Sequence, residues 1–121
     1  DATNLVHPVA AGVTQIGFDH LEFLGDTLEA IASEKAGIYK AGCAAVIGET
    51  DPAIRAALQA HAESASSTPI LVTGRDWQVE QVRVESVGTR FTLTVNGRSR
   101  ELLTPLVGQF QAHNCAVALA M

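Results

Sequence analysis

The stretch that decides the fold is residues 43–72, CAAVIGETDPAIRAALQAHAESASSTPILV. It begins and ends with short apolar runs, residues 43–47 and 70–72, which are typical of buried strands in a parallel sheet. Between these runs, Asp51 suits a helix N-cap and Pro52 suits the first helical position. The stretch therefore predicts a strand–helix–strand unit whose two strands run parallel.

A second unit of the same kind precedes this stretch. Residues 9–16 are largely apolar and predict another buried strand. Asp26 and Glu29 resemble a capping box, so we predict a helix that starts near Asp26 and ends at Gly37. The order strand–helix–strand–helix–strand predicts an α/β fold, with a parallel sheet built from βαβ units over residues 1–76.

The pattern changes further along the chain. Apolar and polar residues nearly alternate over residues 77–104, and Asn96-Gly97 is a strong signal for a two-residue hairpin. This part predicts a small antiparallel sheet. Residues 108–121 predict the start of a helix, with Asn114 as its N-cap.

Composition and charge restrict the class of protein. The 121 residues are 47% hydrophobic and 17% charged, which is ordinary for a globular domain or part of one. The formal net charge is −5 and no block of lysine or arginine is present, so we expect no nucleic-acid partner. No apolar run approaches the ~18 residues of a membrane span. Cys43 and Cys115 lie in no metal-binding pattern and are interpreted as reduced, buried thiols of a cytoplasmic protein.

A polar pair, Asp19-His20, follows the first predicted strand and is a candidate site. Ligands of open parallel α/β sheets bind at the carboxyl edge of the strands, where this pair would lie. The alternative is a loop pair that makes only local hydrogen bonds.

Lys35 is a second candidate, because helical spacing places it on one face with Leu28 and Ile31 and points it partly inward. An ammonium in such a place needs a partner, a lowered pKa or chemical modification. One modification is a carbamate formed with carbon dioxide, whose two anionic oxygens suit Mg²⁺. The alternative is an ordinary solvated pair with Glu34.

Two amides, Gln111 and Asn114, form a third candidate. Each amide carries a donor and an acceptor and can bind the edge of adenine, which for Asn114 is compatible with helix capping. The sequence contains no Walker A motif, no GxGxxG, no GxSxG and no paired Cys/His metal spacing. The residues alone therefore indicate an α/β domain with a candidate loop site.

Three segments together resemble one known family. The first is DATN at residues 1–4, followed by TQIGFDH at residues 14–20. The second is LGDTLEAIASEKAGI at residues 24–38, and the third is LVGQFQAHN at residues 106–114. In this order they resemble the folylpolyglutamate synthase/dihydrofolate synthase family of the Mur ligase superfamily, over essentially the whole chain. The context E-K-A-G-I in the second segment distinguishes this folate branch from other Mur-type ligases.

This resemblance implies part of the central ATP-binding domain of a Mur-type ligase. It implies an enzyme that uses ATP and Mg²⁺ to add L-glutamate to folate or dihydropteroate through an acyl phosphate, and that acts as a monomer. It also implies that the P-loop would precede Asp1 and that a C-terminal domain would follow Met121, so we expect this fragment to be inactive alone. Two alternatives stay open: a ligase of peptidoglycan precursors, and a non-catalytic domain that binds a partner or nucleotide.

The resemblance implies roles at six positions of this sequence, which are His20, Lys35, Asn114, Gln111, Asp1 and Ala2. The histidine and the carbamylated lysine would carry catalysis and bind the metal. The two amides would lie on the adenine side of the nucleotide, and the last two residues beside the folate or pterin pocket. At Phe110 the family usually has histidine, so a role for that side chain is not implied.

Overall fold

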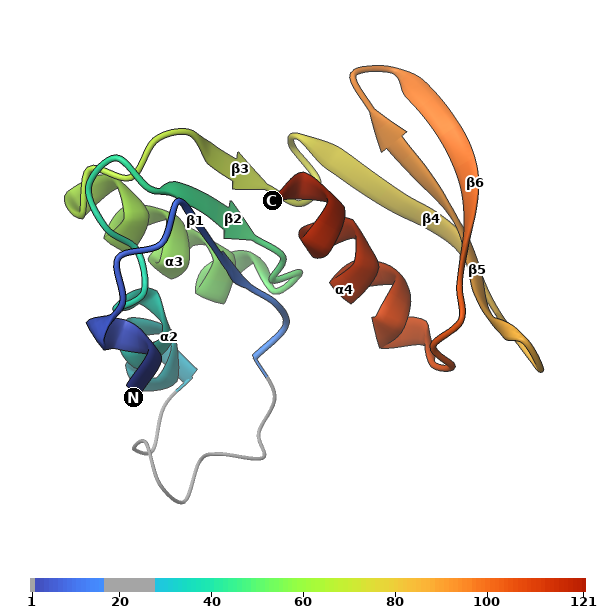
Figure 1. Ribbon diagram of the computed structural model, residues 1–121, viewed down its shortest axis with the longest axis horizontal. Helices are drawn as coiled ribbons and strands as arrows, with labels where there is room; N and C mark the ends of the chain where they lie inside the picture. Colours follow the sequence, from blue (N-terminus) through green and yellow to red (C-terminus); the bar gives the residue numbers. More distant parts are fainter. Residues whose placement is uncertain (1, 17–27) are drawn as a thin grey trace.

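The elements follow the predicted order of parallel and antiparallel parts (Figure 1). The computed structural model describes residues 2–16 and 28–121 of the chain. In order, the elements of these residues are η1 (Ala2–Leu5), β1 (Ala10–Val13), α2 (Leu28–Ala36), β2 (Ala44–Ile47), α3 (Pro52–Ser64), β3 (Ile70–Val72), β4 (Trp77–Glu85), β5 (Gly88–Val95), β6 (Arg98–Thr104) and α4 (Gln109–Ala120). The predicted fold class is confirmed. Asp26, the predicted start of the helix before Gly37, lies outside the described residues.

The parallel sheet has the strand order β1-β2-β3. Ala11 pairs with Ala45, which pairs in turn with Ile70. Strand β1 ends three residues earlier than predicted, at Val13, and β2 ends as predicted at Ile47. The sheet therefore ends where polar side chains begin, and its carboxyl edge is well defined.

Helix α3 forms as its sequence predicts. The Asp51 carboxylate accepts hydrogen bonds from the backbone N–H groups of Ala53 at 2.9 Å and Ile54 at 3.1 Å, which satisfies two donors of the first turn. Ile54, Leu58 and Ala62, spaced by four residues, are all buried. The N-cap and the buried apolar face therefore both match the helix that the sequence predicts.

The two faces of β2 show how the layers are stacked. Ala45 and Ile47 belong to a buried cluster with residues of α2 and α3, whereas Val46 between them packs with Val117 of α4. Helices α2 and α3 therefore cover one face of the parallel sheet and α4 covers the other. Figure 1 shows α4 lying between the two sheets. A side chain at Gly48 would overlap that of Val117, so glycine permits this close approach.

The antiparallel sheet has the order β4-β5-β6 and includes the predicted hairpin. Asn96 and Gly97 have φ values of 52° and 75°, which a type I′ turn requires of both central residues. Across this turn Val95 pairs with Arg98. The hairpin prediction is confirmed.

A β-bulge at Gln81 places Val79 and Val84 of β4 on the same face of the sheet. Val79 pairs with Leu93 and Val84 pairs with Thr89. The two β5 partners are four residues apart and share a face, but the two valines are five apart and would point to opposite faces in a regular strand. The register shift near Gln81, which has a φ of 53°, adds the residue that restores a common face.

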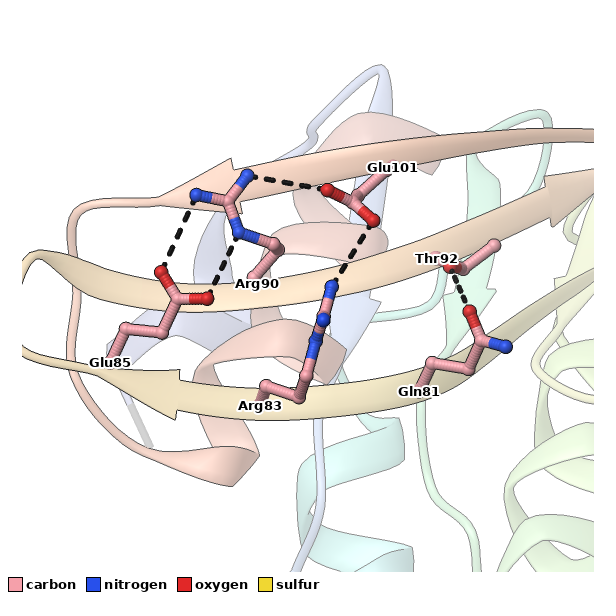
Figure 2. Close-up of polar contacts among 6 residues, drawn as sticks. All are labelled: Gln81, Arg83, Glu85, Arg90, Thr92 and Glu101. Atoms are coloured by element: carbon pink, nitrogen blue, oxygen red, sulfur yellow. Dashed lines mark hydrogen bonds and ion pairs between the residues drawn. The ribbon is translucent and has the colours of Figure 1, made fainter.

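The opposite face of this sheet carries a network of charged side chains (Figure 2). Arg83 lies directly across from Arg90, a repulsive pair on its own. Arg90 contacts Glu85 at 3.0 Å and Glu101 at 3.3 Å, and Arg83 contacts Glu101 at 3.1 Å. The Arg90 hydrogen bond lowers the pKa of Glu85 below its usual range. Because these groups are largely exposed, the network offsets the repulsion and contributes little further stability.

The prediction that Asn114 caps the last helix is wrong. Helix α4 begins at Gln109, and its N-cap residue is Gly108, which makes no side-chain capping bond. The reason is the buried Thr89, whose hydroxyl accepts a hydrogen bond from Gly108 N at 3.0 Å and lies 2.8 Å from the carbonyl oxygen of Leu106. These contacts fix the chain before residue 109, so the helix starts five residues earlier than Asn114.

Two expectations from composition have mixed outcomes. Cys43 and Cys115 are both free thiols, but only Cys43 is buried and Cys115 is half-buried. Within residues 2–16 and 28–121, none of the helices has the length and apolar character needed to cross a membrane.

Candidate active site

Two of the candidate residues, Gln111 and Asn114, lie on the part of α4 that extends toward the carboxyl edge of the parallel sheet. Val117 lies close to Gly48, just after β2, and to Gly12 within β1, while Met121 lies close to Gly12. Helix α4 thus runs against the direction of β1 and β2. Its first turns therefore extend past the carboxyl ends of the strands, on the side where the end of β1 is seen in Figure 1.

Gln111 and Asn114 lie together in these first turns of α4. The Asn114 side chain donates a hydrogen bond to the Gln111 side chain at 3.3 Å, and both residues are half-buried. The contact fixes the orientation of the Gln111 oxygen and leaves the Asn114 oxygen and the Gln111 amino group for another partner. The two amides are therefore in contact with each other, and their binding to adenine stays a prediction.

His113, between these two amides in sequence, has a different environment. Its Nδ1 atom is buried and has no hydrogen-bond partner among the described residues. Burial lowers the pKa of His113 below its usual value. The neutral imidazole is therefore the favoured form in the fold.

This burial predicts a loss of stability in mild acid. The imidazole of the unfolded chain, with its ordinary pKa near 6.5, takes up a proton before the folded one does, so stability is fully present above about pH 7 and falls as the pH drops through 6.5. We expect His113→Gln to flatten this part of the profile, measured as the urea midpoint between pH 5 and 8. The exposed His61 gives the matched control, His61→Gln, which should keep the wild-type slope. An unaltered slope in His113→Gln would contradict the assignment.

Lys35 lies in the last turn of α2 and is half-buried. On the sheet side of this helix, Ile31, Ala32 and Ala36 are buried. Lys35 shares the spacing of four residues with the buried Ile31, and the direction of its side chain stays a prediction. Its carbamylation stays a prediction.

The DATN segment contacts the same turn of α2. Ala2 begins η1, and the Asn4 side chain donates a hydrogen bond to the carbonyl oxygen of Glu34 at 3.2 Å. A side chain at Gly37 would overlap that of Asn4, so this glycine allows the contact. The DATN segment, which is expected beside the folate pocket, is thus hydrogen-bonded to the turn of α2 that contains Lys35. Asp1 lies outside the described residues.

Comparison with known proteins identifies the family of this domain. The family model described as Mur ligase middle domain matches residues 1–121, the whole chain. The chain belongs to this family.

Relatives of this Mur ligase middle domain are named as folate enzymes. It is 38% identical to the folylpolyglutamate synthase of Lacticaseibacillus casei over 98% of the chain and 28% of that protein. It is 32% identical to the dihydrofolate synthase/folylpolyglutamate synthase of Bacillus subtilis, again over 98% of the chain and 28% of that protein. The chain thus spans a little over a quarter of the length of these curated relatives.

A solved structure is also similar. The FPGS-AMPPCP-folate complex superimposes with a TM-score of 0.85 and 36% identity, covering 99% of this chain and 29% of the other. This match spans both the parallel and the antiparallel parts of the Mur ligase middle domain.

The predicted metal site lies only partly within the described residues of this Mur ligase middle domain. Asp19 and His20 lie outside the described residues. Among residues 2–16 and 28–121, no three His, Cys, Asp or Glu side chains gather closely enough to hold a metal ion. A role in metal binding for His20 and Lys35 therefore stays a prediction.

Sequence reasoning missed two polar contacts, those of Glu49 at the carboxyl edge of the sheet and of Asn4 beside the last turn of α2. Glu49 is buried directly after β2 and is bonded to the backbone after β1. The positional argument used for Asp19-His20 applies equally to a glutamate just after a buried strand and could have identified it. Asn4 lies inside the quoted DATN segment, but its contact with α2 joins residues 30 positions apart, which no local pattern shows.

Proposed function

We propose that this chain forms part of the active site of an ATP-dependent amide ligase that adds L-glutamate to folate, dihydropteroate or both. The observation that carries the proposal is similarity along nearly the whole chain to folylpolyglutamate and dihydrofolate synthases. A solved structure similar over the same length holds both AMPPCP, an analogue of ATP, and folate. The proposal concerns the whole protein that contains this domain.

The reaction that we propose has two steps. A carboxylate oxygen of the folate substrate attacks the γ-phosphorus of ATP, and ADP leaves. The amino group of glutamate then attacks the acyl carbon, so the amide forms while phosphate and a proton are released. Both steps bring phosphate and carboxylate groups, all negatively charged, together in the active site. A domain with a net charge of −5 needs positive groups to offset this charge.

We propose a division of roles among four of these residues. His20 and a carbamate on Lys35 would hold Mg²⁺, which when bound neutralises phosphate charge. The half-buried position of Lys35 suits a group with a fixed orientation. The amides of Gln111 and Asn114, already in contact, would bind the edge of adenine.

The remaining parts of the site are assigned to the rest of the whole protein. This sequence has no Walker A motif, so the proposal places the P-loop elsewhere, together with a further domain that binds glutamate. Ala2 with Asp1 would lie beside the folate pocket, near the turn of α2 to which Asn4 is bonded. We further propose a cytoplasmic monomer.

Transfer of labelled glutamate tests the proposal. The whole protein is incubated with Mg·ATP, labelled L-glutamate and either folate or dihydropteroate, and the products are separated and counted. We expect label in a folate product, with ADP formed in equal amount. Ligation of peptidoglycan precursors in place of folates would refute the proposed substrate, and no ligation of any acceptor would refute the proposed activity.

A further inference from the structure

A cavity of about 320 Å³ lies where the end of α4 meets the two sheets. Its walls are mainly apolar and include Leu71 of β3, Trp77 of β4, Leu93 and Val95 of β5, and Leu119 of α4. Figure 1 shows this end of α4 beside the start of β4. The apolar surface continues outside the cavity, because Val95 is 42% exposed and Leu119 is 60% exposed. We call this region the α4–β5 pocket.

Two arginines lie beside the α4–β5 pocket. Arg98 pairs with Val95 across the hairpin, and Arg100 pairs with Leu93. Residues directly opposite each other on antiparallel strands place their side chains on the same face, with Cβ atoms roughly 5 Å apart. Both arginines are exposed, and neither side chain forms an ion pair or hydrogen bond with another residue of the ranges 2–16 and 28–121. Two uncompensated positive charges therefore border an apolar pocket.

The charges on the opposite face of this sheet are arranged differently (Figure 2). Arg83 and Arg90 there each contact a glutamate side chain, at distances of 3.0 to 3.3 Å. Asp76, which lines the α4–β5 pocket, is also paired, with Arg75 at 2.9 Å. The two arginines beside the pocket therefore differ from these residues, because their partners of opposite charge are not found in the described part of the chain.

The α4–β5 pocket suits an apolar side chain better than a small polar ligand. A site for a small ligand has a few polar groups that converge on it. The carboxylate that lines this pocket, Asp76, is already bonded to Arg75 and to the backbone N–H of Val72 at 2.7 Å. An apolar centre with charged groups at its border is instead typical of contacts between protein surfaces.

We propose that the α4–β5 pocket binds an acidic segment of the same protein that lies outside these 121 residues. A large apolar side chain of that segment would enter the cavity beside Trp77, and aspartate or glutamate side chains would pair with Arg98 and Arg100. The chain spans only 28% of the two curated relatives, so a whole protein of their length has many residues that could supply such a segment. The inference rests on the proposed function in one respect, that the chain is part of a longer protein.

Photo-cross-linking in the whole protein tests this inference. Val95 is replaced by p-benzoylphenylalanine, the protein is irradiated, and the cross-linked peptides are identified by mass spectrometry. We expect a cross-link within one polypeptide to a peptide that lies outside these 121 residues and contains aspartate or glutamate. The control is the same replacement at Val87, which is 63% exposed in the turn at the opposite end of β5. This position should give no cross-link to that peptide.

Reversal of the two charges tests the acidic character of the segment. Combined with the replacement at Val95, Arg98→Glu and Arg100→Glu together should lower the yield of the cross-link about tenfold, because like charges then face each other. Arg98→Lys with Arg100→Lys keeps both charges and should retain most of the yield. The proposal would be overturned by a yield that charge reversal leaves unaltered, by a cross-link only to a second copy or only within the 121 residues, or by the absence of any cross-link at residue 95. Glutamate ligation is measured separately, so a protein that forms the cross-link but ligates no glutamate would refute the proposed function and leave this inference standing.

Discussion

Lys35→Ala is expected to lower kcat/KM for glutamate addition by the whole protein roughly 10²–10³-fold, the usual cost of removing one group that stabilises charge in a transition state. The reason is that the variant has no amine to form the carbamate and therefore lacks a proposed ligand of Mg²⁺. Steady-state rates at saturating ATP, with Mg²⁺ varied, measure the effect.

Two controls make the Lys35 result specific. Lys40 is also half-buried and lies just beyond α2, so Lys40→Ala tests the loss of a lysine without loss of the proposed carbamate. Acetate should restore part of the activity of Lys35→Ala, because a small carboxylate can occupy the vacated space and supply two oxygens. Wild-type activity in Lys35→Ala would refute the metal-binding role of this residue.

Phe91→Ala is expected to have the largest effect on stability, about 3–5 kcal/mol in the free energy of unfolding. Phe91 is fully buried on the face of β5 that is directed toward α4, and alanine would leave a cavity there. Urea denaturation of the chain at pH 8, above the titration of His113, measures the change.

Within residues 28–121 the second phenylalanine, Phe110, supplies the matched control. Phe110 in the first turn of α4 is 54% exposed. Phe110→Ala should change the unfolding free energy by well under 1 kcal/mol. Equal losses in the two variants would contradict the description of the core between α4 and the antiparallel sheet.

The parts of the fold that could be predicted are those set by local signals. Asp51 and Pro52 define the start of α3, and its apolar residues recur at one spacing. The hairpin at Asn96-Gly97 follows from backbone angles that few other residue pairs adopt. In each case the neighbouring residues alone determine the structure.

The parts that could not be predicted depend on contacts distant in sequence. The start of α4 is set by Thr89, which lies 19 residues before Gly108. Sequence reasoning chose Asn114 because asparagine is a good cap, and the tertiary contact overrode that preference. The bulge at Gln81 is similar, since only pairing with β5 requires the extra residue.

The same distinction between local signals and distant contacts applies to the candidate site. The carboxyl edge follows from the order of strands and helices, and the place of Lys35 near the end of α2 follows from the predicted helix. The hold of Glu49 on Ile16 spans 33 positions and needed the fold. Roles carried by the family resemblance, at His20 above all, remain predictions.

Transfer of an oxygen atom from the substrate to phosphate tests most directly whether the carboxylate is activated as an acyl phosphate. The folate substrate is labelled with ¹⁸O in the carboxylate that receives glutamate, and the inorganic phosphate formed by the whole protein is examined by ³¹P NMR. An acyl phosphate transfers one carboxylate oxygen to phosphate, so we predict one ¹⁸O atom in each phosphate released. Unlabelled phosphate, formed while the glutamate amide accumulates, would show that the carboxylate is not activated by phosphorylation and would contradict the account.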